Sequence, residues 1–159
     1  MSKCLNRTGH APPIILLWFL TLLWLVFCLY LSWQTGEETS QFSQLVARFL
    51  LDLLGKLGLQ LDSQQFHAGL RLFAHFGVFF VMGLLASAAL LATLAQHRGR
   101  TVFGIASISC ALIAVLAEIG KLGVPGRHLQ WDVSLNVIGA LAGVAAVYTI
   151  QRLIRSVRR

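Results

Sequence analysis

Long apolar runs separated by short polar connections make up most of the chain. A bilayer core takes about 20 apolar residues as a helix, and four of the runs reach that length. They cover residues 11–32, 68–95, 102–122 and 132–153. The pattern predicts an all-α fold, a single membrane domain over residues 1–159 with four transmembrane helices.

Residues 41–57 follow a different pattern. Their apolar positions recur at the i, i+3, i+4 spacing of one helical face, whereas Gln44, Arg48, Asp52 and Lys56 fall on the other. Charges in the middle of the segment disfavour a membrane-spanning helix. The two-faced pattern instead favours an amphipathic helix on the extracytoplasmic side, lying in the membrane interface or packed over the bundle.

Two features predict how the last helix packs. Pro125 and Gly126 mark a tight connection before it, so residues 102–122 and 132–153 are expected to form antiparallel neighbours. Gly139 and Gly143 have the spacing of a small-residue packing face, which lets two membrane helices approach closely.

The composition excludes a typical soluble domain, since 57% of the residues are hydrophobic and only 12% are charged. A net charge of +7 is compatible with nucleic-acid binding, but the basic residues do not gather on a soluble face studded with aromatic residues. We therefore expect no nucleic-acid partner.

The positions of the basic residues fit a membrane topology better. Eight of the thirteen lie at the termini and in the QHRGR connection, which places both termini in the cytoplasm by the positive-inside rule.

The polar residues inside the spanning runs fall at one depth. Arg71 and His75 lie near the start of one helix, Glu118 and Lys121 near the end of the next, and Asp132 and Asn136 near the start of the last. Each pair is expected within roughly the outer 10 to 12 Å of its helix. Ionisable residues at such depth normally face the bundle and mark a functional site. We expect the pairs to meet in one extracytoplasmic site, with Arg127 and His128 closing over it.

Three functions fit this cluster. Arg71, Lys121 and Arg127 would bind a lipid phosphate or pyrophosphate at headgroup depth, with Asn136 as a hydrogen-bonding partner. Alternatively, His75 paired with Glu118 or Asp132 would act as an acid/base catalyst, a hydrolase or transferase on a lipid headgroup. As a third alternative, the polar residues would only hold the helices together in a packing or assembly subunit.

Cofactor motifs are absent from the sequence. His67, His75 and His128 could be combined with a carboxylate, but no close-spaced metal-ligand motif such as HExxH occurs. No phosphate-cradling P-loop occurs either. We expect neither a metal ion nor a cofactor, and we assign no redox role to the three cysteines.

Three stretches of the chain resemble the VanZ-like family of bacterial membrane proteins. They are Ser32-Trp-Gln34-Thr-Gly-Glu-Glu-Thr39 with Ser43, Arg71-x3-His75-Phe76 with Gly83, and Glu118-x6-Pro125-Gly126-Arg127 followed by Asp132, Asn136, Gly139 and Gly143. The sequence departs from the family pattern at Lys121, where Gln is frequent, at Leu72, where Lys is frequent, and at Val78, where some members have Glu.

The resemblance implies a location in the bacterial cytoplasmic membrane. It also implies that a shared polar site is formed by Arg71, His75, Glu118, Arg127, Asp132 and Asn136. The family takes its name from a protein associated with resistance to glycopeptide antibiotics, particularly teicoplanin. By analogy, a membrane lipid or a lipid-linked precursor of the cell wall is the expected partner.

Overall fold

A computed structural model of the chain describes residues 11–33, 36–56, 62–94, 99–120 and 132–157, which include five helices and no strand. The helices are α1 (Ala11–Trp33), α2 (Gly36–Lys56), α3 (Ser63–Thr93), α4 (Gly99–Gly120) and α5 (Asp132–Val157). All but α2 are long and apolar enough to cross a membrane. The predicted all-α fold with four spanning helices and one amphipathic helix is confirmed.

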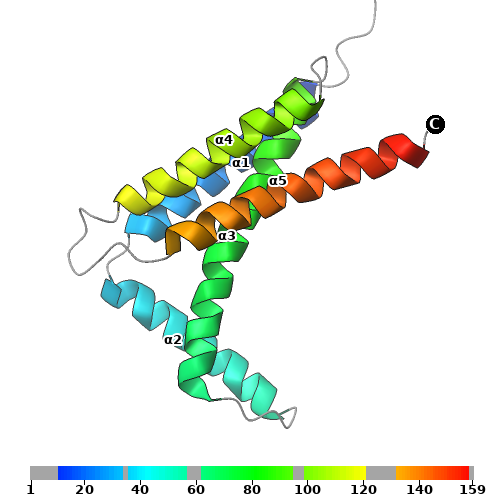
Figure 1. Cartoon of the computed structure of the whole chain (residues 1–159). Coiled ribbons are helices and arrows are strands. Elements are labelled where there is room, and N and C mark those ends of the chain that lie inside the picture. Colours follow the sequence, from blue (N-terminus) through cyan, green and yellow to red (C-terminus); the bar gives the residue numbers. More distant parts are fainter. Residues whose placement is uncertain (1–10, 34–35, 57–61, 95–98, 121–131, 158–159) are drawn as a thin grey trace, which may run out of the picture.

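Helix α3 is the centre of the fold, and it contacts each of the other four described helices. Its C-terminal part lies among α1, α4 and α5, while its N-terminal part projects beyond them (Figure 1). At a rise of 1.5 Å per residue, the 31 residues of α3 extend about 46 Å, against about 33 Å for the 22 residues of α4. The difference in length explains the projection.

The start of α3 lies five residues before the predicted one, at Ser63 instead of residue 68. Asp62 is the N-cap, and its side chain accepts a hydrogen bond from the backbone nitrogen of Gln64 at 3.2 Å. The apolar run gave no hint of this polar first turn. The sequence nevertheless contains a capping pattern, Asp62-x-x-Gln65, that marks a helix start.

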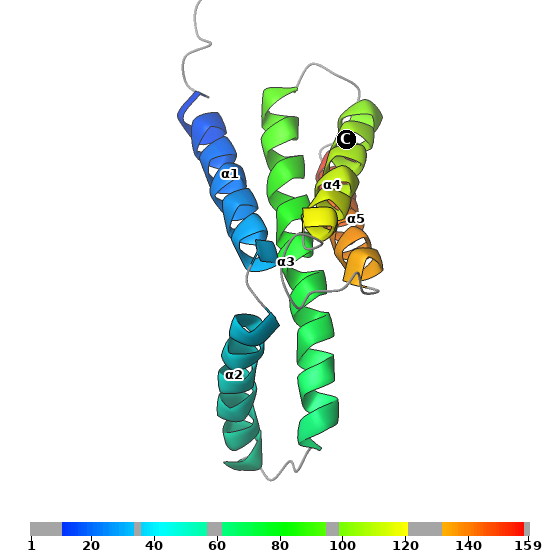
Figure 2. The same ribbon diagram turned by 90° about the vertical axis from the view of Figure 1, so that its left-hand side faces the viewer.

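Helix α2 packs along the projecting part of α3. In Figure 2, α1 and α2 follow one another along one side of α3, with α4 and α5 on the other side. The sequence left open whether this helix lies in the membrane interface or packs over the bundle. The structure shows α2 packed against α3, but α2 runs beside α3 and does not cross the end of the bundle. It begins at Gly36, five residues before the predicted start.

The surface of α2 is divided into three stripes. Ala47 is buried and Val46, Leu50 and Leu54 are half-buried, so this stripe faces the protein. The polar stripe of Gln44, Arg48, Asp52 and Lys56 is exposed, as predicted. Between the two, Leu45, Phe49 and Leu53 form an exposed apolar stripe, although the sequence pattern grouped them with the packed residues.

Helices α3 and α5 approach closely through glycines. A Cβ atom on Gly139 or Gly143 would collide with the backbone oxygen of Phe76 or Phe80 on α3, and one on Gly83 would collide with the backbone of Ala140. The predicted small-residue face of the last helix is confirmed. Helix α5 also contacts α4, as expected for neighbours joined by a short connection.

Two tryptophans join α1 to α3. The indole nitrogen of Trp18 donates to the hydroxyl of Thr93 at 2.8 Å, and that of Trp24 donates to the backbone oxygen of Val78 at 2.9 Å. The remaining surface of α1 is strongly apolar, with exposed residues that include Leu16, Phe19 and Leu23. Apolar exposure of this extent suits contact with lipid and not with water.

Candidate polar site

A chain of hydrogen bonds joins α3, α5 and α4 at one level of the bundle. Nδ1 of His75 lies 3.2 Å from Oδ1 of Asn136, and Nδ2 of Asn136 donates to Oε2 of Glu118 at 3.2 Å. The three residues are separated in the sequence by 61 and 18 positions. We call His75, Asn136 and Glu118 the polar triad. The sequence expectation that helices 68–95, 102–122 and 132–153 contribute polar residues at a common depth agrees with this arrangement.

Burial makes these hydrogen bonds important. Glu118 and Asn136 are each only 1% exposed, and His75 is half-buried. In an apolar environment a polar group that loses its partner costs about 1–3 kcal/mol, and more if it is charged. The triad therefore constrains how α3, α4 and α5 sit against each other, whatever else it does.

The ends of α4 and α5 place two members of the triad. Glu118 lies in the last turn of α4 and Asn136 in the second turn of α5. His75, in contrast, is not close to the end of its helix, because it lies about 18 Å along α3 from Ser63. It is the projection of α3 that brings a residue from the middle of one helix to the ends of two others.

The glycine contacts hold Asn136 in register. Gly139 follows Asn136 by three residues, so both point towards α3, and Gly139 lies against the backbone of Phe76, the residue after His75. The close approach at Gly139 thus places the Asn136 amide beside the imidazole of His75. The three-residue spacing of Asn136 and Gly139 is therefore explained by the geometry of the α3–α5 contact.

Arg71 lies one helical turn before His75, on the same face of α3 and towards its projecting end. Its side chain is exposed, whereas His75 is half-buried. A cation at the surface thus adjoins the buried triad.

The other predicted site residues are not all described. Lys121, Arg127 and His128 lie outside the described residues. Asp132 is the first residue of α5, which places its backbone one turn before Asn136, but its side chain is outside the description. The first family-like stretch is described only in part. Gln34 lies outside the described residues, whereas Ser32 is buried and donates to the backbone oxygen of Cys28 at 2.9 Å.

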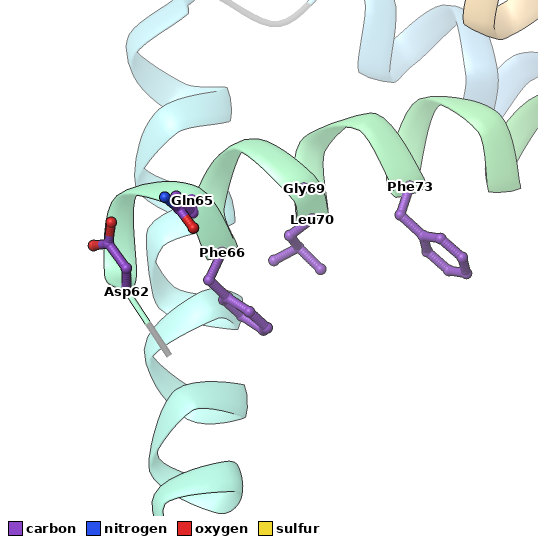
Figure 3. A pocket seen from close by; sticks show the side chains of 6 residues that line it. All are labelled: Asp62, Gln65, Phe66, Gly69, Leu70 and Phe73. Atoms are coloured by element: carbon purple, nitrogen blue, oxygen red, sulfur yellow. The ribbon is translucent and has the colours of Figure 1, made fainter. Parts of the chain in front are cut away.

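A second feature of α3 was not predicted. An open hollow of about 450 Å³ is lined by Asp62, Gln65, Phe66, Gly69, Leu70 and Phe73, on the projecting part of the helix (Figure 3). At about 100° per residue, Phe66 and His75 lie on opposite sides of α3. The hollow is therefore separate from the polar triad. The spacing of Phe66, Leu70 and Phe73 signals an apolar face, but in the sequence it merges with the spanning run.

No group of three or more His, Cys, Asp or Glu side chains with the geometry to hold a metal ion occurs within the described part of the chain. The chemistry that the polar triad offers is hydrogen bonding and proton transfer through an imidazole, an amide and a carboxylate.

The model of the VanZ/LLP1 family matches residues 17–152, which is most of the chain and includes every residue of the polar triad. The chain belongs to the VanZ/LLP1 family. This confirms the resemblance found in the sequence. No curated protein and no solved structure matches this VanZ-family chain.

Membership of the VanZ family and the four apolar helices agree with each other: the protein is an integral membrane protein. Three of the family-like positions that the structure describes meet in the polar triad. His75, Glu118 and Asn136 come from separate stretches of the sequence and form one hydrogen-bonded chain.

Proposed function

We propose that this VanZ-family protein binds the phosphate of an anionic envelope lipid or a lipid-linked cell-wall precursor at the polar triad and the adjoining Arg71. The observation that carries the proposal is the hydrogen-bonded chain His75–Asn136–Glu118, in which Asn136 and Glu118 are buried, one helical turn from the exposed Arg71. In this proposal Arg71 binds phosphate with Arg127 and Lys121, while Asp132 and Glu118 orient the basic groups.

The physical basis is charge-assisted hydrogen bonding. A guanidinium presents paired donors that match two oxygens of a phosphate, and such bonds are stronger where water is scarce. The buried triad next to Arg71 supplies fixed dipoles at little cost in side-chain entropy. A lipid reaches such a site laterally, because the exposed surface of the four spanning helices is apolar.

The site would face the extracytoplasmic leaflet of the bacterial cytoplasmic membrane, with both termini in the cytoplasm. The basic residues at the termini and in the QHRGR connection support this orientation. A lipid-linked wall precursor in that leaflet would connect the protein to glycopeptides such as teicoplanin, which is the association that the family name carries.

Native mass spectrometry of the purified protein tests the proposal. We expect wild type to retain an anionic lipid that is lost in Arg71→Ala and in the Arg71→Ala, Arg127→Ala double variant. Arg100→Ala is the matched control, because it removes an exposed cation from the opposite end of α4 from Glu118. Equal lipid retention in wild type and the double variant would refute the proposal and leave the packing role as the explanation of the triad.

A second candidate is an acid/base hydrolase or transferase acting on the same headgroup. The triad favours it specifically, since an imidazole whose Nδ1 is held by a fixed partner is the arrangement of a general base. Headgroup turnover that disappears in His75→Gln, while lipid retention persists, would establish catalysis. Retention without turnover in wild type would leave the protein as a binder.

A further inference from the structure

The end of the bundle opposite the polar triad holds two arginines close to the start of α4. A Cβ atom at Gly99, the first residue of α4, would lie 3.7 Å from Nη1 of Arg155 and 3.4 Å from Oε1 of Gln151. The guanidinium carbon of Arg152 lies 5.1 Å from the centre of the Tyr148 ring. Arg152 and Arg155 are neighbours on one side of α5, and Arg155 reaches across to α4.

No acidic side chain of the protein lies near these two cations. The six acids of the sequence are Glu37, Glu38, Asp52, Asp62, Glu118 and Asp132, which belong to α2, to the start of α3 and to the far ends of α4 and α5. Among the described residues, neither guanidinium has a hydrogen bond or an ion pair. An anion that neutralises Arg152 and Arg155 must therefore come from outside the chain.

The lengths of α4 and α5 place these arginines near a membrane surface. At 1.5 Å per residue, Gly99 lies about 28 Å along α4 from Glu118, and Arg155 lies about 28 Å along α5 from Asn136. These separations are close to the roughly 30 Å thickness of a bilayer core. With the polar triad near one surface of the membrane, Arg155 lies near the headgroups of the other.

Apolar side chains adjoin the two cations on α5. Ile150, Leu153 and Ile154 are exposed, and an apolar surface of this kind suits lipid acyl chains. A guanidinium binds phosphate through paired, charge-assisted hydrogen bonds. A phospholipid fits both parts of this surface, because its phosphate meets the arginines while its acyl chains cover the apolar residues.

We propose that Arg152 and Arg155 bind the phosphate of an anionic phospholipid at this end of the bundle. Basic pockets between membrane helices are known sites for such headgroups. The bound phosphate lies between the end of α5 and the start of α4, and it stabilises the contact between the two helices there. This site is separate from the one proposed at the polar triad, and neither depends on the other.

Thermal unfolding and native mass spectrometry test the site in Arg71→Ala protein, in which lipid at the proposed triad site does not contribute. Phosphatidylglycerol should raise the unfolding temperature of this parent in detergent more than phosphatidylcholine does. The Arg152→Gln, Arg155→Gln double variant should lose this difference, and its retention of phosphatidylglycerol should fall about fivefold for each arginine removed. In phosphatidylcholine alone it should unfold close to the temperature of the parent, which shows that it is folded. An equal effect of both lipids on the parent would overturn the proposal.

Arg100→Gln is the matched control for Arg155→Gln. It removes one cation from the same end of α4, but Arg100 lies about 100° around the helix from Gly99. Arg155→Gln should weaken retention of phosphatidylglycerol more than Arg100→Gln does. Equal losses would mean that surface charge acts without a site, which would overturn the proposal. Inorganic phosphate that stabilises the parent as much as phosphatidylglycerol would overturn the assignment to lipid and indicate a soluble phosphate as the ligand.

Discussion

Gly143 of α5 lies directly against the backbone of Phe80 on α3, so that a Cβ atom there would collide with the carbonyl oxygen. Gly139, one turn earlier, makes the same kind of contact with Phe76. These contacts set the distance between the two helices that carry His75 and Asn136. The geometry of the polar triad therefore depends on glycines that take no part in its chemistry.

Gly143→Ala should destabilise the protein, because the backbone of Phe80 cannot move aside as a side chain would. Overpacking of a well-packed interior typically costs about 1–3 kcal/mol, and we expect a loss of this size in the free energy of unfolding in detergent. Gly104→Ala is the matched control, since a Cβ at Gly104 meets nothing within 4 Å. Equal stability of the two variants would mean that α3 and α5 are further apart than described.

Removing the carboxylate of Glu118 should also destabilise the protein, in a graded way. Glu118→Leu leaves the buried amide of Asn136 without its acceptor and should cost about 1–3 kcal/mol. Glu118→Gln retains a carbonyl oxygen that accepts from Asn136, so it should cost less. Thermal unfolding in detergent measures both, with Ile119→Ala, an exposed position on the same turn, as the control. The reverse order of the two Glu118 variants would contradict the assigned hydrogen bond.

The attachment of α1 to α3 through Trp24 is open to a similar test. Trp24→Phe keeps an aromatic ring but removes the hydrogen bond to the backbone oxygen of Val78. Hydrogen bonds between membrane helices average about 0.6 kcal/mol, so a modest loss in the free energy of unfolding is expected. Phe19→Leu, at an exposed position of α1, should change stability less.

The spanning helices were predictable because each is an apolar run long enough for a bilayer, and this signal does not depend on neighbours. The first residues of α3 and α2 were not predictable from this signal, because polar first turns extend both helices beyond the apolar pattern. Asp62 and Gln65 did carry a capping signal. The sequence pattern also assigned too wide a packed face to α2, because Ala47 is buried whereas Phe49 is exposed. Which of the apolar residues of α2 are buried depends on where α3 lies against it.

The site followed from the sequence in part. Depth along each helix brought His75, Glu118 and Asn136 to one level, and the structure joins them. In the hydrogen-bonded triad, Asn136 lies between His75 and Glu118. This order depends on the rotation of α5 about its axis, and the sequence periodicity does not determine that rotation. The Gly139 contact with Phe76 fixes that rotation.

The exposed apolar stripe of α2 should contact lipid. Leu45, Phe49 and Leu53 are exposed next to a polar stripe, a pattern typical of helices at the membrane interface. A spin label at Phe49→Cys should be accessible to oxygen, and one at Arg48→Cys to a water-soluble relaxation agent, in protein whose native cysteines are replaced. Equal access of both labels to the aqueous agent would show that α2 stands clear of the membrane.

The orientation in the membrane should follow the basic residues. Four spanning helices return the chain to the side on which it starts, and arginines such as Arg152 and Arg155 end the last one. A green fluorescent protein fused after Arg159 should therefore fluoresce, because it folds in the cytoplasm. Alkaline phosphatase inserted between α2 and α3 should be active, because it matures outside. Activity of a phosphatase fused at the C-terminus would reverse the topology and would move the polar triad, with Arg71, to the cytoplasmic leaflet. Lipids of the outer leaflet would then be excluded as ligands, whereas the hydrogen bonds of the triad would be unaffected.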